Sequence, residues 1–207
     1  MRDKKIWIFN AGNAFDGNPK WLFMYIVNYR KDITPYWFCY TEEARDYIRK
    51  LGYQVFLFKS KMAEKIGSQA GVYVVNQKKE IFQDYLKGIT VLNLWHGVGC
   101  KTVEKGVTYG FLNERIIKKH IINMDCYQNY QLFLVTSPLM EKHFIKQCDL
   151  AEDKIIRAGY PCCFYPGKIK TYDHDILKQK KLPEDTKIAV YAPTYRDASA
   201  TNFFSQA

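Results

Sequence analysis

The sequence predicts an α/β fold in which a parallel β-sheet is flanked by helices. Along the first hundred residues, five short apolar segments of strand type alternate with four helical stretches. That alternation is typical of βα units, which build parallel sheets. Gly, Pro and Asn cluster between the segments, as expected of turns. Hydrophobic residues make up 47% of the chain, which supports a packed core and excludes a disordered protein.

The elements of the first half follow from apolar runs and their end signals. Asn18 followed by Pro19 is typical of a helix N-cap with proline at the first helical position. Thr41 caps the next helix, and Gly52 follows its last turn as a C-cap. We expect strands at residues 5–9, 36–40, 54–58, 72–75 and 90–94, and helices at 19–29, 42–50, 59–70 and 79–86.

The second half is less regular. We expect helices at residues 110–122, 138–147 and 173–181, and strands at 132–135, 154–158 and 187–191. The helix at 110–122 is basic and amphipathic, which fits either a membrane-interface contact or an ordinary surface helix. A polar, lysine-rich stretch near 162–182 marks a boundary. We therefore predict a first domain at 1–165, a linker at 166–186 and the start of a second domain at 187–207.

Residues 91–101, VLNLWHGVGCK, are the segment around which the chain is organised. They begin as a buried strand and end as a glycine-broken loop. Ligands of open α/β sheets bind beyond the carboxyl ends of strands, where His96 is expected to lie. Gly97 and Gly99 can take positive φ and bring backbone N–H groups close to an anion, and Lys101 adds a positive charge. A histidine base beside a phosphate cradle suits transfer of a phosphorylated group to a hydroxyl. A purely structural histidine is the alternative.

Charge and cysteine usage narrow the class of protein. The net charge of +10 indicates an anionic partner, which composition leaves open between nucleic acid, anionic membrane and phosphorylated substrate. The six cysteines form no C-x-x-C motif and none has zinc-ligand spacing to a histidine, so we predict no metal and no cofactor. No G-x-G-x-x-G follows a strand, which argues against a dinucleotide site. No apolar run is long enough to span a bilayer, and free thiols in a reducing cytosol are the simplest expectation.

Four stretches carry a resemblance to one family, namely residues 94–101 (LWHGVGCK), 134–144 with Thr-Ser-Pro, 158–161 (AGYP) and 190–197 (VYAPTYRD). In this order they resemble the CDP-glycerol glycerophosphotransferases, the teichoic acid primases and polymerases. The first stretch is similar to the family's Trp-His-Gly motif, and the second resembles the segment before its conserved turn. Residues 158–161 (AGYP) match its Gly-Tyr-Pro turn, and residues 190–197 (VYAPTYRD) resemble its Tyr-Ala-Pro-Thr-Trp-Arg motif. The chain departs from the pattern at Val98-Gly99-Cys100, at Cys162-Cys163-Phe164 and at Tyr195. The resemblance therefore does not identify the polyol or the acceptor.

The resemblance implies the Rossmann-like N-terminal half of a GT-B fold, so that this chain is part of a longer enzyme and inactive alone. It implies transfer of glycerol phosphate or a related polyol phosphate from a CDP-polyol to a lipid-linked acceptor, with release of CMP. His96 would be the general base. The substrate would contact Asn18, Gly97, Gly99, Lys101, Thr194 and Arg196. The family's members are peripheral enzymes of the cytoplasmic membrane face, where a basic surface meets anionic lipid.

The residues also fit two other interpretations of the protein's function. A non-catalytic basic module for nucleic acid or anionic membrane would explain the charge. The aromatics, however, lie in apolar segments rather than among the basic runs, and no nucleic-acid motif appears, so we expect no nucleic acid partner. A catalytically inactive half-enzyme kept as a membrane or partner module is the third reading.

Overall fold

The computed structural model describes residues 1–12, 14–77, 83–99, 102–118, 132–167 and 176–191. The chain divides into two compact units, residues 1–169 and 170–207. The first unit contains the sheet and carries the Trp-His-Gly motif.

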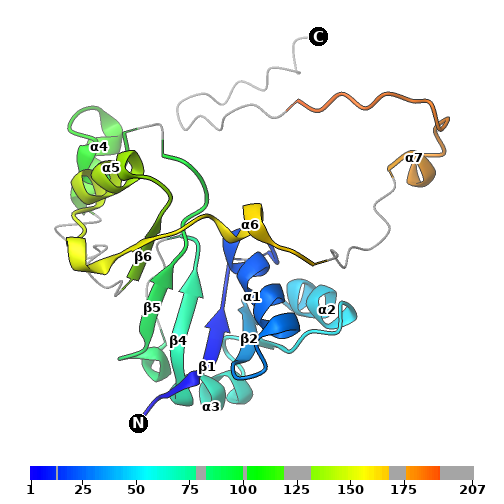
Figure 1. Cartoon of the computed structure of the whole chain (residues 1–207), viewed down its shortest axis with the longest axis horizontal. Helices are drawn as coiled ribbons and strands as arrows, with labels where there is room; N and C mark the ends of the chain where they lie inside the picture. Colours follow the sequence, from blue (N-terminus) through cyan, green and yellow to red (C-terminus); the bar gives the residue numbers. More distant parts are fainter. Residues whose placement is uncertain (13, 78–82, 100–101, 119–131, 168–175, 192–207) are drawn as a thin grey trace. The chain divides into compact units, whose positions relative to one another are not determined.

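Seven parallel strands form one sheet in the order β3-β2-β1-β4-β5-β6-β7 (Figure 1). The predicted α/β fold is therefore confirmed, and each strand predicted between residues 5 and 158 is present, its ends displaced by two residues at most. Since all the strands run the same way, the loops that follow them meet at one edge, called the carboxyl edge here. The strands are β1 Asp3–Phe9, β2 Thr34–Cys39, β3 Val55–Leu57, β4 Ala70–Val75, β5 Thr90–Asn93, β6 Leu132–Val135 and β7 Ile155–Arg157.

Helices connect successive strands and pack against the sheet. Within the first unit, α1 packs against β1 and β2, α2 against β2 and β3, and α5 against β6. Of the helix predicted at 79–86, the described part forms only a 3₁₀ turn, η1, and residues 79–82 lie outside the described residues. Further 3₁₀ turns are η2 at Glu104–Gly106 and η5 at Glu152–Lys154. The remaining bounds are α1 Gly17–Tyr29, α2 Glu42–Lys50, α3 Lys61–Gln69, η1 Asp84–Leu86, α4 Phe111–Ile117, α5 Pro138–Cys148 and α6 Pro161–Phe164.

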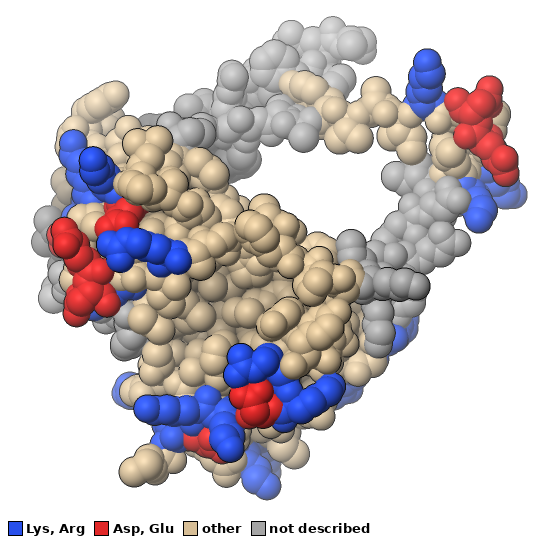
Figure 2. All heavy atoms as spheres, in the orientation of Figure 1, with Lys and Arg blue, Asp and Glu red and all other residues tan. Residues whose placement is uncertain are grey.

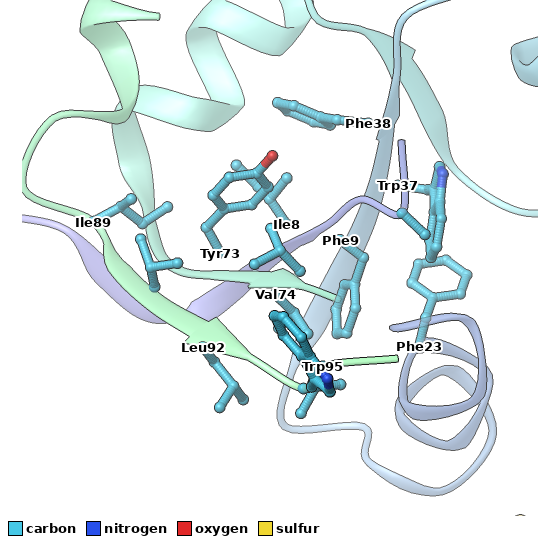
Figure 3. Close-up of a cluster of buried hydrophobic side chains, with 14 of the residues drawn as sticks. Ile8, Phe9, Phe23, Trp37, Phe38, Tyr73, Val74, Ile89, Leu92 and Trp95 are labelled. Carbon is cyan, nitrogen blue, oxygen red and sulfur yellow. The ribbon is translucent and has the colours of Figure 1, made fainter. Parts of the chain in front are cut away.

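Both faces of the sheet are buried, as parallel sheets require. Ile8 and Phe9 are neighbours in β1, point to opposite faces and are both fully buried (Figure 3). On the face of Phe9, Phe23 of α1 makes edge contacts with Phe9 and with Trp37, at ring-centroid distances of 5.4 and 5.7 Å. This aromatic cluster holds α1 on the sheet and therefore sets the position of the helix's first turn at the carboxyl edge.

Of two predicted helix N-caps, the structure confirms one and contradicts the other. Thr41 caps α2 as predicted, because its side chain accepts a hydrogen bond from the Ala44 N–H at 3.3 Å, and Gly52 has a φ of +83° after that helix. Asn18, however, is not the N-cap of α1. The helix begins at Gly17 with Asp16 in the cap position, and Asn18 lies in the first turn. Its side-chain amide donates instead to the Leu94 and Trp95 carbonyls.

The second unit contains the short helix α7, Ile176–Gln179, within the predicted helix at 173–181, of which 173–175 lie outside the described residues. The strand predicted at 187–191 is wrong, because those residues form no strand. A strand requires a neighbour to complete its backbone hydrogen bonds, and no ladder includes this segment. The side chains of Ile188, Val190 and Tyr191 are 54%, 84% and 63% exposed.

Candidate functional site

His96 lies at the carboxyl edge, three residues after the end of β5, as the sequence predicts. It follows Trp95, whose ring is buried against Phe133 of β6 and Phe144 of α5 at centroid distances of 5.6 and 5.0 Å. The tryptophan therefore anchors the loop to the core. The histidine next to it remains exposed at the surface.

The turn that carries His96 is built by an asparagine. Asn93, fully buried at the end of β5, accepts a hydrogen bond from the Trp95 N–H at 2.8 Å through its side-chain oxygen. Trp95 itself has a φ of +54°, a left-handed conformation uncommon for a large side chain. Gly97 and Gly99 can take positive φ, but neither glycine does so in this structure. The reversal occurs two residues earlier, where the Asn93 side chain and the burial of the indole stabilise it.

The His96 imidazole is stacked on the Trp95 indole, with centroids 4.4 Å apart and planes 23° from parallel. Loss of hydration at this position lowers the pKa of His96 below its ordinary value of 6.5. The neutral imidazole is therefore the dominant form at pH 7. A neutral imidazole on an exposed edge can accept a proton from a bound hydroxyl.

Asn18 ties the first turn of α1 to the loop of His96. Its side-chain amide donates to the Trp95 carbonyl at 2.9 Å and to the Leu94 carbonyl at 3.3 Å. Its oxygen accepts a hydrogen bond from the Cys162 N–H at 3.4 Å. Asn18 is only 3% exposed. One buried side chain thus joins α1 and α6 to the loop that follows β5.

Tyr160, from the Gly-Tyr-Pro turn, makes the second connection. Its buried hydroxyl donates a hydrogen bond to the Gly97 carbonyl at 2.6 Å. Burial raises the pKa of Tyr160, and a hydrogen bond with Thr136 lowers it by less. The Thr-Ser-Pro segment is held in turn by Ser137, which caps α5 by accepting from the Met140 N–H at 3.2 Å. Stretches distant in the sequence therefore converge on the Trp-His-Gly loop.

The two predicted cradle glycines have different surroundings. A Cβ added at Gly97 would meet no atom within 4 Å. A Cβ added at Gly99 would lie 2.8 Å from Nε2 of His143 and 3.2 Å from Cζ of Phe144. The Gly99 N–H contacts the Met140 sulfur at 3.3 Å. Gly99 therefore brings the loop close to α5, and its N–H is directed toward that helix.

Charged side chains lie mostly elsewhere on the face that Figure 2 shows. Lys and Arg gather near the N-terminus, at the amino ends of the strands, and again beside α4 and α5, with Asp and Glu among them. The surface over α1 and α6 is largely uncharged in this view. Within the described parts of the chain, no three His, Cys, Asp or Glu side chains are grouped to hold a metal ion. The described helices include none long and apolar enough to cross a membrane.

All 207 residues match the family model described as CDP-Glycerol:Poly(glycerophosphate) glycerophosphotransferase. The chain belongs to this family. The resemblance drawn from the four motifs is thus confirmed. No curated protein matches the sequence.

Solved structures of the wall teichoic acid polymerase TagF share the fold. One, a histidine-to-asparagine variant soaked with CDPG, superposes with a TM-score of 0.69 at 18% identity and covers 95% of this chain and 49% of its own. A histidine-to-alanine variant gives a TM-score of 0.66 at 19% identity, with the same coverage. TagF without a stated substitution superposes with a TM-score of 0.65 at 18% sequence identity. The chain spans about half the length of these structures.

Of the predicted site residues of this glycerophosphotransferase-family chain, the structure brings together Asn18, His96, Gly97 and Gly99. Lys101, Thr194 and Arg196 lie outside the described residues. Sequence reasoning missed three buried asparagines at the carboxyl edge, Asn10, Asn76 and Asn93. The sequence contains a signal that could have identified them, because each asparagine stands at the end of an apolar strand: Phe9-Asn10, Val75-Asn76 and Leu92-Asn93. In such positions a side-chain amide can replace backbone partners that the strand no longer supplies.

Proposed function

We propose that the protein containing this chain transfers glycerol phosphate, or a related polyol phosphate, from a CDP-polyol to a lipid-linked polyol-phosphate or glycan acceptor, with release of CMP. Membership of the glycerophosphotransferase family supports the reaction class. The observation that carries the proposal for this chain is His96, exposed at the carboxyl edge, stacked on Trp95 and with a lowered pKa.

In the proposed reaction, a hydroxyl of the acceptor attacks the β-phosphorus of the CDP-polyol. A bond forms between the hydroxyl oxygen and phosphorus, and the bond between that phosphorus and the oxygen of CMP breaks. The neutral His96 imidazole takes the proton of the attacking hydroxyl. Stacking on the indole keeps the ring in one orientation, so that little ordering is required when the acceptor binds.

The remaining residues receive narrower roles. Gly97 and Lys101 are proposed to face the negative charge that develops on phosphate, and Thr194 and Arg196 to bind phosphate oxygens, on the strength of their motifs. Gly99 is proposed to act through close packing on α5. Asn18 is buried and bonded to the loop of His96, so we propose that it positions His96 and does not itself bind substrate.

CMP release tests the function. The natural protein that contains this chain is incubated with a lipid-linked acceptor and with CDP-glycerol or CDP-ribitol, and CMP is quantified. We expect CMP release that depends on the acceptor and favours one donor, which identifies the polyol. Absence of release with every CDP-polyol would reject the transferase and leave a binding module.

We also propose that the protein acts at the cytoplasmic face of the membrane as a peripheral protein, held by its net charge of +10. Retention on anionic vesicles, on neutral vesicles and on an oligonucleotide is compared at matched salt. We expect retention on anionic vesicles that weakens as salt rises. Tight oligonucleotide binding without vesicle binding would contradict this and favour a nucleic-acid module.

A further inference from the structure

A hollow opens at the carboxyl edge, away from His96. It has a volume of about 540 Å³ and lies between the loop after β1 and the start of α2. A volume of this size is typical of small-molecule sites. The described residues that line it are Ala14, Phe15, Thr41, Glu43, Ala44 and Tyr47.

The floor of the hollow is apolar and rigid. The Phe15 ring is 7% exposed and is fixed by an edge contact with Trp37 at a centroid distance of 4.7 Å. Ala44 is buried beside it, and Tyr47 presents a partly exposed ring from the next turn of α2. Small apolar groups with an aromatic ring form a surface on which the C–H face of a sugar or polyol can pack.

The rim provides hydrogen-bonding groups for hydroxyls. The Thr41 oxygen accepts from the Ala44 N–H, and its hydroxyl proton remains a donor. Glu43 contributes a carboxylate, which accepts hydrogen bonds from hydroxyl groups. Together they can fix the orientation of a neutral ligand that carries several hydroxyls.

The charges of the hollow disfavour phosphate. Among the described residues that line it, none is basic. The N-terminus of α2, which would attract an anion, already carries Glu42 and Glu43 in its first turn. Lys20 lies 5.5 Å from the Phe15 ring centroid, and its charge is offset by Asp16. An uncharged ligand is therefore favoured over a phosphate group.

The hollow and His96 lie along the same carboxyl edge of the sheet. Its walls follow β1 and β2, and His96 follows β5, which is separated from β1 by β4 alone. At about 4.8 Å between neighbouring strands, the hollow lies about 10–14 Å from the end of β5 along the same edge. One extended acceptor molecule can reach both positions.

We propose that this hollow binds an uncharged sugar or polyol unit of the acceptor, while the reacting hydroxyl lies at His96. This proposal rests on the proposed transferase function for its biological meaning, but not for its binding test. The hollow would then act as an acceptor subsite, separate from the donor's phosphates.

The binding test uses the natural protein that contains this chain and saturation-transfer NMR, with ribitol and a methyl N-acetylglucosaminide as probes. We expect saturable transfer from at least one probe, weakened tenfold or more by Glu43→Gln and by Tyr47→Ala. Tyr29→Ala, an exposed tyrosine on α1, and His96→Ala are expected to leave probe binding unchanged, and inorganic phosphate is expected not to compete. No saturable binding to the folded chain, unchanged binding by both hollow variants, or competition by phosphate would overturn the proposal.

A kinetic test separates this proposal from the proposed function. In the natural protein, Glu43→Gln and Tyr47→Ala should raise KM for the acceptor tenfold or more and leave KM for the CDP-polyol unchanged. An unchanged acceptor KM in an active enzyme would reject the subsite and leave the transferase intact. Probe binding by a protein that never releases CMP would reject the transferase and leave the hollow as a binding site.

Discussion

The hydroxyl of Tyr160 donates a hydrogen bond of 2.6 Å to the carbonyl of Gly97, and so joins the Gly-Tyr-Pro turn to the Trp-His-Gly loop. The two residues are 63 positions apart in the sequence. Because Gly97 follows His96 directly, this bond fixes one end of the segment that presents the imidazole. Asn18 fixes the other end through the Leu94 and Trp95 carbonyls.

Replacement of Tyr160 by Phe tests this bond. The variant keeps the buried ring but leaves the Gly97 carbonyl and Thr136 without the hydroxyl, so we expect a loss of about 1–3 kcal/mol in the free energy of unfolding. Urea denaturation measures it. Tyr165→Phe is the matched control, because the Tyr165 hydroxyl accepts only an exposed hydrogen bond from Asn28 among the bonds described, and it should cost under about 0.5 kcal/mol. Equal effects of the two variants would show that the Tyr160 bond does not hold the loop.

Two asparagines of the same helix give a second comparison. Asn18→Ala removes the donor from two carbonyls of the His96 loop, and we expect it to destabilise the fold by about 1–3 kcal/mol and to reduce turnover. Asn28→Ala removes an amide from the exposed face of α1 and should leave turnover unchanged. Thermal unfolding and CMP release are measured for both variants. If Asn18→Ala keeps wild-type turnover, the positioning role assigned to Asn18 is wrong.

Gly97 and Gly99 should differ in how strongly replacement by Ala destabilises the protein. Gly99→Ala places a methyl group against His143 and Phe144, so a destabilisation of about 1–3 kcal/mol is expected. Gly97→Ala meets open space and should change stability by less than about 0.5 kcal/mol. The denaturant midpoints of the two variants measure these changes in stability. Adding His143→Ala should recover part of the loss at Gly99, and a strictly additive double variant would argue against the contact.

The lowered pKa of His96 predicts the pH profile. A base must be deprotonated to act, so kcat/KM should rise with pH through the pKa of His96 and reach its plateau at a lower pH than a histidine with the ordinary pKa of 6.5 would give. For stability, the folded state binds fewer protons at this residue than the unfolded state. His96 therefore disfavours folding progressively as pH falls through 6.5 toward its folded pKa. Proton NMR titration of the imidazole, assigned with His96→Asn, measures the pKa, and a value above 6.5 would contradict the prediction.

The sequence predicted the sheet because its strands are continuous apolar runs, buried on both faces. Ile8 and Phe9 illustrate this, since consecutive buried residues in one strand require cover on both sides. The Thr41 cap was predictable because its hydrogen bond is local. Asn18 was misassigned because its partners, the Leu94 and Trp95 carbonyls, lie 76 and 77 residues away. Local cap preference could not reveal that competition.

The candidate site could be predicted only where its residues follow directly from the strand pattern. His96 was found because a polar residue after an apolar strand is expected at the carboxyl edge. The left-handed conformation of Trp95 was not predicted, because glycine is the usual residue at positive φ. It depends on Asn93 and on burial of the indole between β6 and α5. The strand predicted at 187–191 failed because apolar composition alone does not supply a neighbouring strand.

His96 is the proposed base of a site assembled from these converging loops. The most direct measurement is CMP release by the natural protein and by its His96→Ala variant, with His143→Ala as the matched histidine control. Loss of a general base predicts a fall of about 10²–10⁴-fold in kcat for His96→Ala, with unfolding unchanged and His143→Ala within several-fold of wild type. Turnover by a folded His96→Ala variant close to that of the wild type would contradict the account.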